Sequence, residues 1–148
     1  MSDADRQPGP ADVRVAGLSI WVFGRQFEDL HDFWDGNWLE VLARCEAESA
    51  CVQARGAIIH APELYRWLEE ARRCHESLNG TAELVCLEPH VNARLSLEQG
   101  RGELIVDITP DLLNQQHRFT FAIDQSYLPA LISGLEGIAA RFPIRDPR

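Results

Sequence analysis

Apolar and polar residues alternate with a period of two over much of the chain, which is typical of half-buried β-strands. The alternation is cleanest in Val91–Glu98, where every second residue is apolar. Several similar segments have turn residues at both ends, and these segments are also predicted to be strands. These segments are Val13–Phe23, Trp38–Ala47, Ala50–Ile59, Thr81–Leu87, Glu103–Thr109 and His117–Asp124.

The second and third of these segments are predicted to form a hairpin. A two-residue turn at Glu48-Ser49 would pair Cys45 with Val52 and Ala43 with Ala54, which joins the apolar faces of the two strands. Glu-Ser is not a favoured hairpin pair, so a longer loop is the alternative.

Two segments have apolar residues at helical spacing instead. The first begins at Pro62 and ends before Asn79-Gly80, and the second runs from Ser126 to Phe142. We expect Asp124 or Ser126 to cap the second helix and its two glycines to allow close packing against the sheet. These glycines are Gly134 and Gly137.

The predicted order of elements is βββ-α-ββββ-α. It favours an α+β fold in which one mainly antiparallel sheet of about six to seven strands carries two helices. We expect residues 1–12 to be a flexible N-terminal tail, residues 13–142 a single domain, and residues 143–148 a C-terminal tail.

Charge and composition exclude several functions. The formal net charge is −9, which argues against a nonspecific partner of nucleic acid or acidic membranes. All 14 basic residues are Arg, so chemistry that needs a lysine is excluded. The acidic N-terminus and the lack of a long apolar stretch predict a cytoplasmic protein with no membrane span.

The chain offers few candidates for catalysis, and we expect neither a metal nor a cofactor. The cysteine spacing C-x5-C-x22-C-x11-C fits no zinc or redox motif, so we interpret these residues as reduced packing residues, with a disulfide as the alternative. They are Cys45, Cys51, Cys74 and Cys86. His31, Asp32 and Asp35 are the candidates for a hydrolase, although such aspartates more commonly cap turns.

The segment Trp34–Leu39 combines two tryptophans with a short polar turn. Its Asp, Gly and Asn residues favour a tight turn through side-chain bonds to backbone and the conformational freedom of Gly. We therefore expect Asp35 and Asn37 to bond to backbone and at least one of Trp34 and Trp38 to be largely buried.

Together with other segments, this turn resembles a family of small bacterial proteins, some of which are WapI-type immunity proteins. The similarity covers about residues 18–142, but Cys and Ala replace more typical strand residues in the hairpin. The segments that carry it are Trp34–Leu39, Leu78–Gly80 leading into Ala82–Leu84, Leu87–Pro89 and Phe119–Leu128. Its motif residues are Trp34, Asp35, Gly36, Asn37, Trp38, Asp124, Gln125 and Tyr127.

The resemblance implies a non-enzymatic protein that occludes the toxin domain of a secreted polymorphic toxin. A basic toxin domain would suit the acidic chain, because opposite charges speed association. The candidate contacts are Glu40, Glu46, Glu63, Glu69 and Glu70. A small-ligand-binding or housekeeping domain is the alternative, and the sequence leaves the oligomeric state open.

Overall fold

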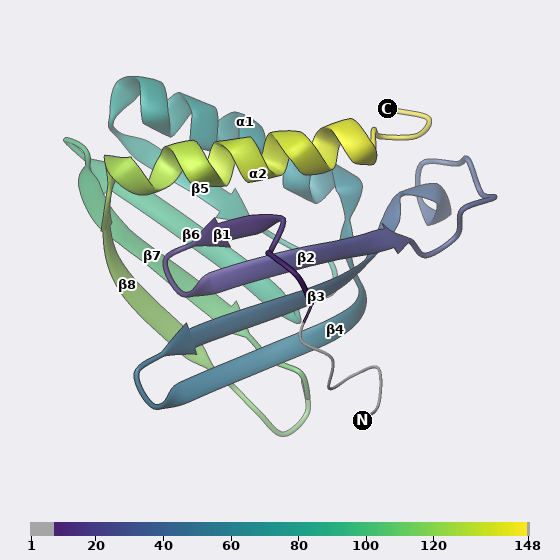
Figure 1. The fold of residues 1–148 in the computed structure, drawn as a ribbon, viewed down its shortest axis with the longest axis horizontal. Coiled ribbons are helices and arrows are strands. Elements are labelled where there is room, and N and C mark those ends of the chain that lie inside the picture. The colour runs from purple at the N-terminus through teal and green to yellow at the C-terminus, as the bar shows by residue number, and fades with distance from the viewer. Residues whose placement is uncertain (1–7, 148) are drawn as a thin grey trace.

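The computed structural model describes residues 8–147, which form two antiparallel sheets and two helices (Figure 1). The first sheet contains β1 (Val13–Val15), β2 (Leu18–Arg25), β3 (Trp38–Ala47) and β4 (Ala50–His60). The second contains β5 (Gly80–Leu84), β6 (Val91–Glu98), β7 (Arg101–Ile108) and β8 (Arg118–Asp124). Helix α1 (Ala61–Ser77) connects the sheets, and α2 (Leu128–Arg141) follows β8.

The α+β class, the antiparallel pairing and the two helices are confirmed, but the strands are divided differently from the expectation. Instead of one sheet of six to seven strands there are two sheets of four. The division arises because β4 continues directly into α1, which carries the chain away from the first sheet. The four strands that follow then pair only with one another, in chain order.

The segment expected to be one strand at Val13–Phe23 is a hairpin of β1 and β2. Its turn is Ala16-Gly17, and Ala16 has a φ of 50°, in the left-handed region. A Cβ at position 17 would lie 2.1 Å from the carbonyl oxygen of Glu46 on β3, so only Gly fits there. Ala-Gly is a weak turn signal among alternating apolar residues, which is why the turn was not predicted.

The predicted β3–β4 register is confirmed. Cys45 lies opposite Val52 and Ala43 lies opposite Ala54. The turn is the two-residue Glu48-Ser49 pair, in which Ser49 takes a positive φ of 64°. The pairing of the two apolar faces therefore determines the register even though the turn residues are unfavourable.

The core lies between the two sheets and the helix pair. Strands β3 and β4 contact β7 across the core, while α1 packs on β5, α2 packs on β1, and the helices pack on each other. Figure 1 shows the two helices running along the same side of both sheets. The largest fully buried side chain is that of Trp67 on α1.

Helix α2 begins at Leu128, two residues later than predicted, and its N-cap residue Tyr127 makes no side-chain capping bond. The expected cap residue Asp124 instead caps a short 3-10 turn that precedes the helix. The Asp124 carboxylate accepts a hydrogen bond of 2.8 Å from the Ser126 amide in a short 3-10 turn, and Pro129 lies in the first turn of the helix. Within residues 8–147, neither helix combines the length and the apolar character that a bilayer-spanning segment requires.

The two glycines of α2 have different surroundings. A Cβ at Gly134 would lie 2.4 Å from the carbonyl oxygen of Asp12, whereas a Cβ at Gly137 would have no atom within 4 Å. Close packing is therefore confirmed for Gly134 alone. We expect Gly134→Ala to destabilise the fold by about 1–3 kcal/mol because the helix must move away from β1.

The matched variant Gly137→Ala should stabilise the protein by about 0.5–1 kcal/mol, because Ala favours helix and nothing obstructs it. Urea unfolding of both variants measures the difference. Equal effects at the two positions would show that the glycines share one role.

Both ends of the described chain bond to the domain. Asp12, in the segment expected to be a tail, accepts from the Val22 amide (2.7 Å) and pairs with Arg141. Arg145, beyond the expected domain boundary, bonds to the loop after β2 through its side chain and backbone. Residues 1–7 of the expected N-terminal tail lie outside the described residues.

Candidate functional site

The loop between β2 and β3 ends in a compact 3-10 turn at Asp35–Asn37. The carboxylate of Asp32 accepts a hydrogen bond of 2.9 Å from the Asp35 amide, so Asp32 takes the role that was expected of Asp35. Gly36 is required by close packing, because a Cβ there would lie 2.6 Å from the carbonyl oxygen of Leu30.

Asn37 is the fully buried residue at the centre of this loop. Its Nδ2 donates to the carbonyl oxygens of Phe33 (2.7 Å) and Arg145 (2.9 Å), and its Oδ1 accepts from the Arg145 amide (2.8 Å). The expected bonding of Asn37 to backbone is thus confirmed. Because two of these bonds reach residue 145, Asn37 ties the loop to the C-terminal segment.

Two arginines hold the same loop from either side. Arg25 donates to the carbonyl oxygens of Gly36 (2.8 Å) and Pro143 (2.6 Å), and burial, followed by the nearby charge of Arg145, lowers its pKa. Arg145 donates to the carbonyl oxygens of Glu28 (2.9 Å) and Leu30 (2.6 Å). These bonds fix the loop backbone in one conformation.

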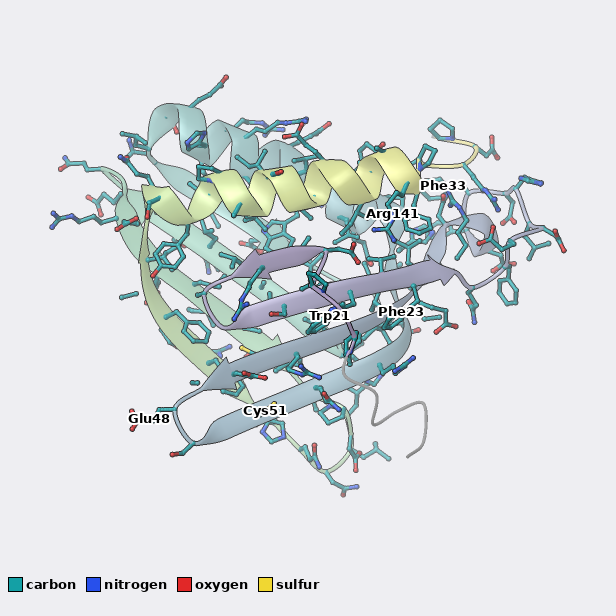
Figure 2. The ribbon with its side chains drawn as sticks, in the orientation of Figure 1. Trp21, Phe23, Phe33, Glu48, Cys51 and Arg141 are labelled. Carbon is teal, nitrogen blue, oxygen red and sulfur yellow. The ribbon has the colours of Figure 1, made fainter. Side chains whose placement is uncertain are left out.

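His60, at the end of β4, is the buried centre of an aromatic cluster. Its ring stacks on Trp34 at a centroid distance of 5.6 Å and an interplanar angle of 11°, and it also contacts Phe33 and Trp38. Its Nε2 lies 3.0 Å from the carbonyl oxygens of both Phe33 and Trp34, so this nitrogen carries a proton that it donates. Figure 2 shows Phe33 in the loop after β2, on the same side of the molecule as the C-terminal segment.

The two tryptophans of the motif differ in exposure. Trp34 is 50% exposed, whereas Trp38 is in large part buried, as expected for at least one of the pair. The polar Asn37 between them is completely buried, and its hydrogen bonds hold the turn. The outer part of Trp34 remains available for contact.

A groove of about 360 Å³ runs between this loop, the first turn of α1 and the loop after β5. Three of its apolar side chains are well exposed: Trp34 at 50%, Val85 at 59% and Leu87 at 66%. The sequence predicted a strand through Leu87, but β5 ends at Leu84, which leaves Val85 and Leu87 on a surface loop. The groove is lined by Phe33, Trp34, His60, Pro62, Glu63, Arg66, Glu83, Val85, Cys86 and Leu87.

Glu63 joins two walls of the groove. One of its carboxylate oxygens accepts from the His60 amide at the start of α1 (2.7 Å), and the other accepts from the Leu87 amide (2.8 Å). Burial raises the pKa of this carboxyl group. Burial, together with the neighbouring Glu63, also raises the pKa of the Cys86 thiol, so Cys86 lacks the low pKa of a reactive cysteine.

The raised pKa of Glu63 predicts a specific pH dependence of stability. The folded state holds this proton more tightly than the unfolded chain, so the contribution of Glu63 to stability falls as the pH rises from below 4.5 through the raised pKa. Glu63→Gln removes this dependence. As the pH rises, the unfolding free energy of the wild type, measured in urea, should therefore fall relative to that of the variant.

Glu69→Gln is the matched control for this measurement, because Glu69 lies on the same helix with a side chain that is 61% exposed. The difference in unfolding free energy between Glu69→Gln and wild type should change less with pH. Parallel pH profiles for wild type and Glu63→Gln would contradict the assignment of Glu63 as a buried titrating group.

The structure does not bring the five candidate glutamates together. Glu40 and Glu46 lie on β3, where Glu46 is 3.8 Å from Arg44, whereas the other three lie on α1. Glu69 pairs with Arg73 (3.6 Å), and Glu70 accepts from the Glu83 amide (2.9 Å), which ties α1 to β5. Only Glu63 lines the groove.

His31, Asp32 and Asp35 are exposed on the loop, where Asp32 already serves the turn. Within residues 8–147, no group of three His, Cys, Asp or Glu residues is placed to hold a metal ion. The geometry at these three residues is that of a turn.

All four cysteines are free thiols. Cys45, Cys74 and Cys86 are buried as expected of packing residues, but Cys51 is exposed. Figure 2 shows Cys51 on β4, in the same sheet as Trp21 and Phe23 of β2. The predicted β3–β4 register places Cys45 and Cys51 on opposite faces, and the burial of Cys45 alone confirms that placement.

A larger hollow of about 540 Å³ lies at the ends of β7 and β8, and it is polar. Its Arg118 and Asp107 already bond to each other at 2.8 Å, so its main charges satisfy one another. The groove beside Trp34 is therefore the better candidate, because Trp34, Val85 and Leu87 gather well-exposed apolar side chains there.

Several residues of this site gave no signal in the sequence. Arg25, His60 and Arg145 are isolated in the chain, and only the fold brings them to the Trp34 loop. Pro89 was a usable signal for Val85 and Leu87, because proline disfavours a continuing strand and suggests a loop there.

Comparison with known proteins identifies a family for this chain. No curated protein and no solved structure shows significant similarity to the chain. The family model described as the immunity protein WapI-like family matches residues 13–143, which include the groove, the Asn37 turn and both helices. The match covers most of the chain, and this protein belongs to the immunity protein WapI-like family.

Proposed function

We propose that this protein is an immunity protein that binds the toxin domain of a secreted polymorphic toxin in the cytoplasm and blocks it by occlusion. The family match over residues 13–143 is the observation that carries the proposal. The protein acts by binding, without catalysis. The turn geometry at Asp32 and the raised pKa of Cys86 agree with this, because neither group is prepared for a reaction.

The net charge of −9 supports a basic toxin domain as the partner. Toxins that cut nucleic acids need positive charge at their substrate cleft, and an acidic protein is attracted to such a cleft at long range. We therefore expect the association rate to fall about tenfold or more between low and high salt. Stopped-flow or surface-based kinetics measure this rate, and a rate independent of salt would contradict electrostatic attraction.

Protection of cells tests the function itself. Where the gene of a large secreted protein lies directly upstream of this chain's gene, the C-terminal domain of that protein is the probe. Cells that produce this domain should die, and cells that also produce the immunity protein should survive. A WapI-like protein paired with a different toxin is the control. Equal killing with and without this chain would contradict the proposed function.

A further inference from the structure

The groove beside Trp34 has two facing walls with different properties. One wall belongs to the acidic loop, defined as residues 27–37, and the other belongs to the apolar loop, defined as residues 85–90. Scattered exposed apolar residues are normal on a protein surface, but apolar side chains gathered at one groove mark a contact site. Trp34, Val85 and Leu87 are gathered in this way, since all three are well exposed and line the same groove.

Carboxylate residues outnumber arginines around the groove. The groove itself is lined by Glu63 and Glu83 with one cation, Arg66. The acidic loop, which lines it through Phe33 and Trp34, contains four more carboxylate residues and no Arg: Glu28, Asp29, Asp32 and Asp35. Across the groove the apolar loop adds Glu88, which is exposed. Arg66 pairs with Glu70 (3.5 Å), and Arg145 binds backbone carbonyls and pairs with Glu28 (3.9 Å). Since Glu28 and Arg145 balance each other, Asp29, Asp32 and Asp35 carry the excess negative charge of the acidic loop.

The indole of Trp34 adds a recognition element for a cation. His60 stacks on one face of the ring, and half of the side chain is still exposed. A tryptophan face is the best aromatic partner for the cation of an arginine or lysine, and such side chains also lay their aliphatic stems on apolar surface. Val85 and Leu87 provide that apolar surface beside the ring.

The groove is also rigid before a partner arrives. Asn37, Arg25 and Arg145 fix the backbone of the acidic loop, and Glu63 bonds the apolar loop to the start of α1. Because both walls are held in place, binding costs little ordering of the loops.

We propose that this groove is the docking site for a basic segment of the toxin domain, and that an arginine or lysine side chain of the partner lies on Trp34 between the acidic and apolar loops. This proposal rests on the proposed function. The excess of carboxylates disfavours nucleic acids and acidic lipid surfaces as occupants. A cationic protein surface fits both the charge and the apolar contacts of the groove.

Binding of the purified toxin domain to four variants tests the proposal. Leu87→Arg places a cation in the groove, and Trp34→Ala removes the aromatic face. Each should weaken the affinity about tenfold or more, as for a central interface residue. Leu113→Arg makes the same charge change on a leucine that is 93% exposed in the β7–β8 loop, and it should change the affinity less than about threefold. Trp34→Phe keeps an aromatic ring, so its affinity for the toxin domain should lie between those of wild type and Trp34→Ala.

The outcomes separate the groove from the function. Melting curves first establish that each variant is folded, which the exposure of Trp34, Leu87 and Leu113 favours. If the groove variants bind the toxin domain as tightly as wild type does, the groove is not the docking site. The proposed immunity function is unaffected by that result. Equal losses of affinity in Leu87→Arg and Leu113→Arg would show that net charge alone governs binding. That result would also contradict the groove as the docking site.

If wild type does not bind the toxin domain at all, the proposed function itself fails. Sedimentation of the free protein completes the test. A change in oligomeric state on Trp34→Ala would assign the groove to a second copy of this chain and overturn the proposal.

Discussion

Replacing Asn37 by alanine is expected to destabilise the protein by about 3 kcal/mol and to disorder the wall of the groove. The substitution removes one buried side chain that satisfies the carbonyl oxygens of Phe33 and Arg145 and the amide of Arg145. The Phe33 carbonyl oxygen keeps the His60 Nε2 as a donor, whereas the two Arg145 groups lose the Asn37 side chain. Each buried polar group left without a partner costs about 1–3 kcal/mol. Urea unfolding measures the loss, and hydrogen exchange should show faster exchange in residues 27–37 than elsewhere.

Asn37→Asp separates the hydrogen bonds from the volume of the side chain. Aspartate has the same shape, but it places an oxygen where Nδ2 donates to two carbonyl oxygens. We therefore expect Asn37→Asp to destabilise the protein as well, although Arg25, with its Nη1 3.2 Å from Oδ1, offsets part of the loss. An aspartate variant as stable as wild type would contradict the role of the amide as donor.

The second large effect is expected at Trp67, which lies at the centre of the core on α1. Trp67→Ala should destabilise the fold by about 3–5 kcal/mol, because it removes a fully buried indole and leaves a cavity. Thermal and urea unfolding measure this loss. A cost below about 1 kcal/mol would show that the surrounding sheets collapse onto the space.

Trp67→Phe is the informative comparison. The Trp67 Nε1 is buried and has no hydrogen-bond partner within residues 8–147. Trp67→Phe removes this unsatisfied group and retains much of the apolar volume. It should therefore destabilise the protein much less than Trp67→Ala does. A phenylalanine variant as unstable as the alanine variant would indicate that the indole has a partner in solution.

The sequence predicts most secondary structure because period-two and helical patterns are local. The register of β3 and β4 follows from the need to join two apolar faces, and this need outweighs the poor turn residues Glu48-Ser49. The 3-10 turn before α2 is also local, since the Asp124 carboxylate accepts from an amide two residues away. These features depend on neighbours in the chain.

The missed features depend on contacts between distant segments. The turn at Ala16-Gly17 is fixed by the close approach of β3, which no pattern within residues 13–23 reveals. Likewise, the division into two sheets follows from where α1 takes the chain after β4. Local alternation identifies strands but does not assign them to a sheet.

The candidate site illustrates the same limit. Trp34–Trp38 is recognisable in the sequence, but its exposed indole, its buried Asn37 and its bonds to Arg145 become visible only when residues more than 100 positions apart meet. The five glutamates were chosen by charge alone, and the fold uses Glu63 and Glu70 to hold α1 to neighbouring backbone. Charge in the sequence therefore did not identify which of the glutamates have structural roles.

The most direct test of occlusion by this protein is the activity of the toxin domain during titration with the purified immunity protein. The toxin domain used in the protection test is assayed on its own substrate while the protein is added. We expect activity to fall to background at equimolar protein, and Trp34→Ala to require at least about tenfold more protein. A toxin domain that stays fully active with a saturating excess of the wild-type protein would contradict the account.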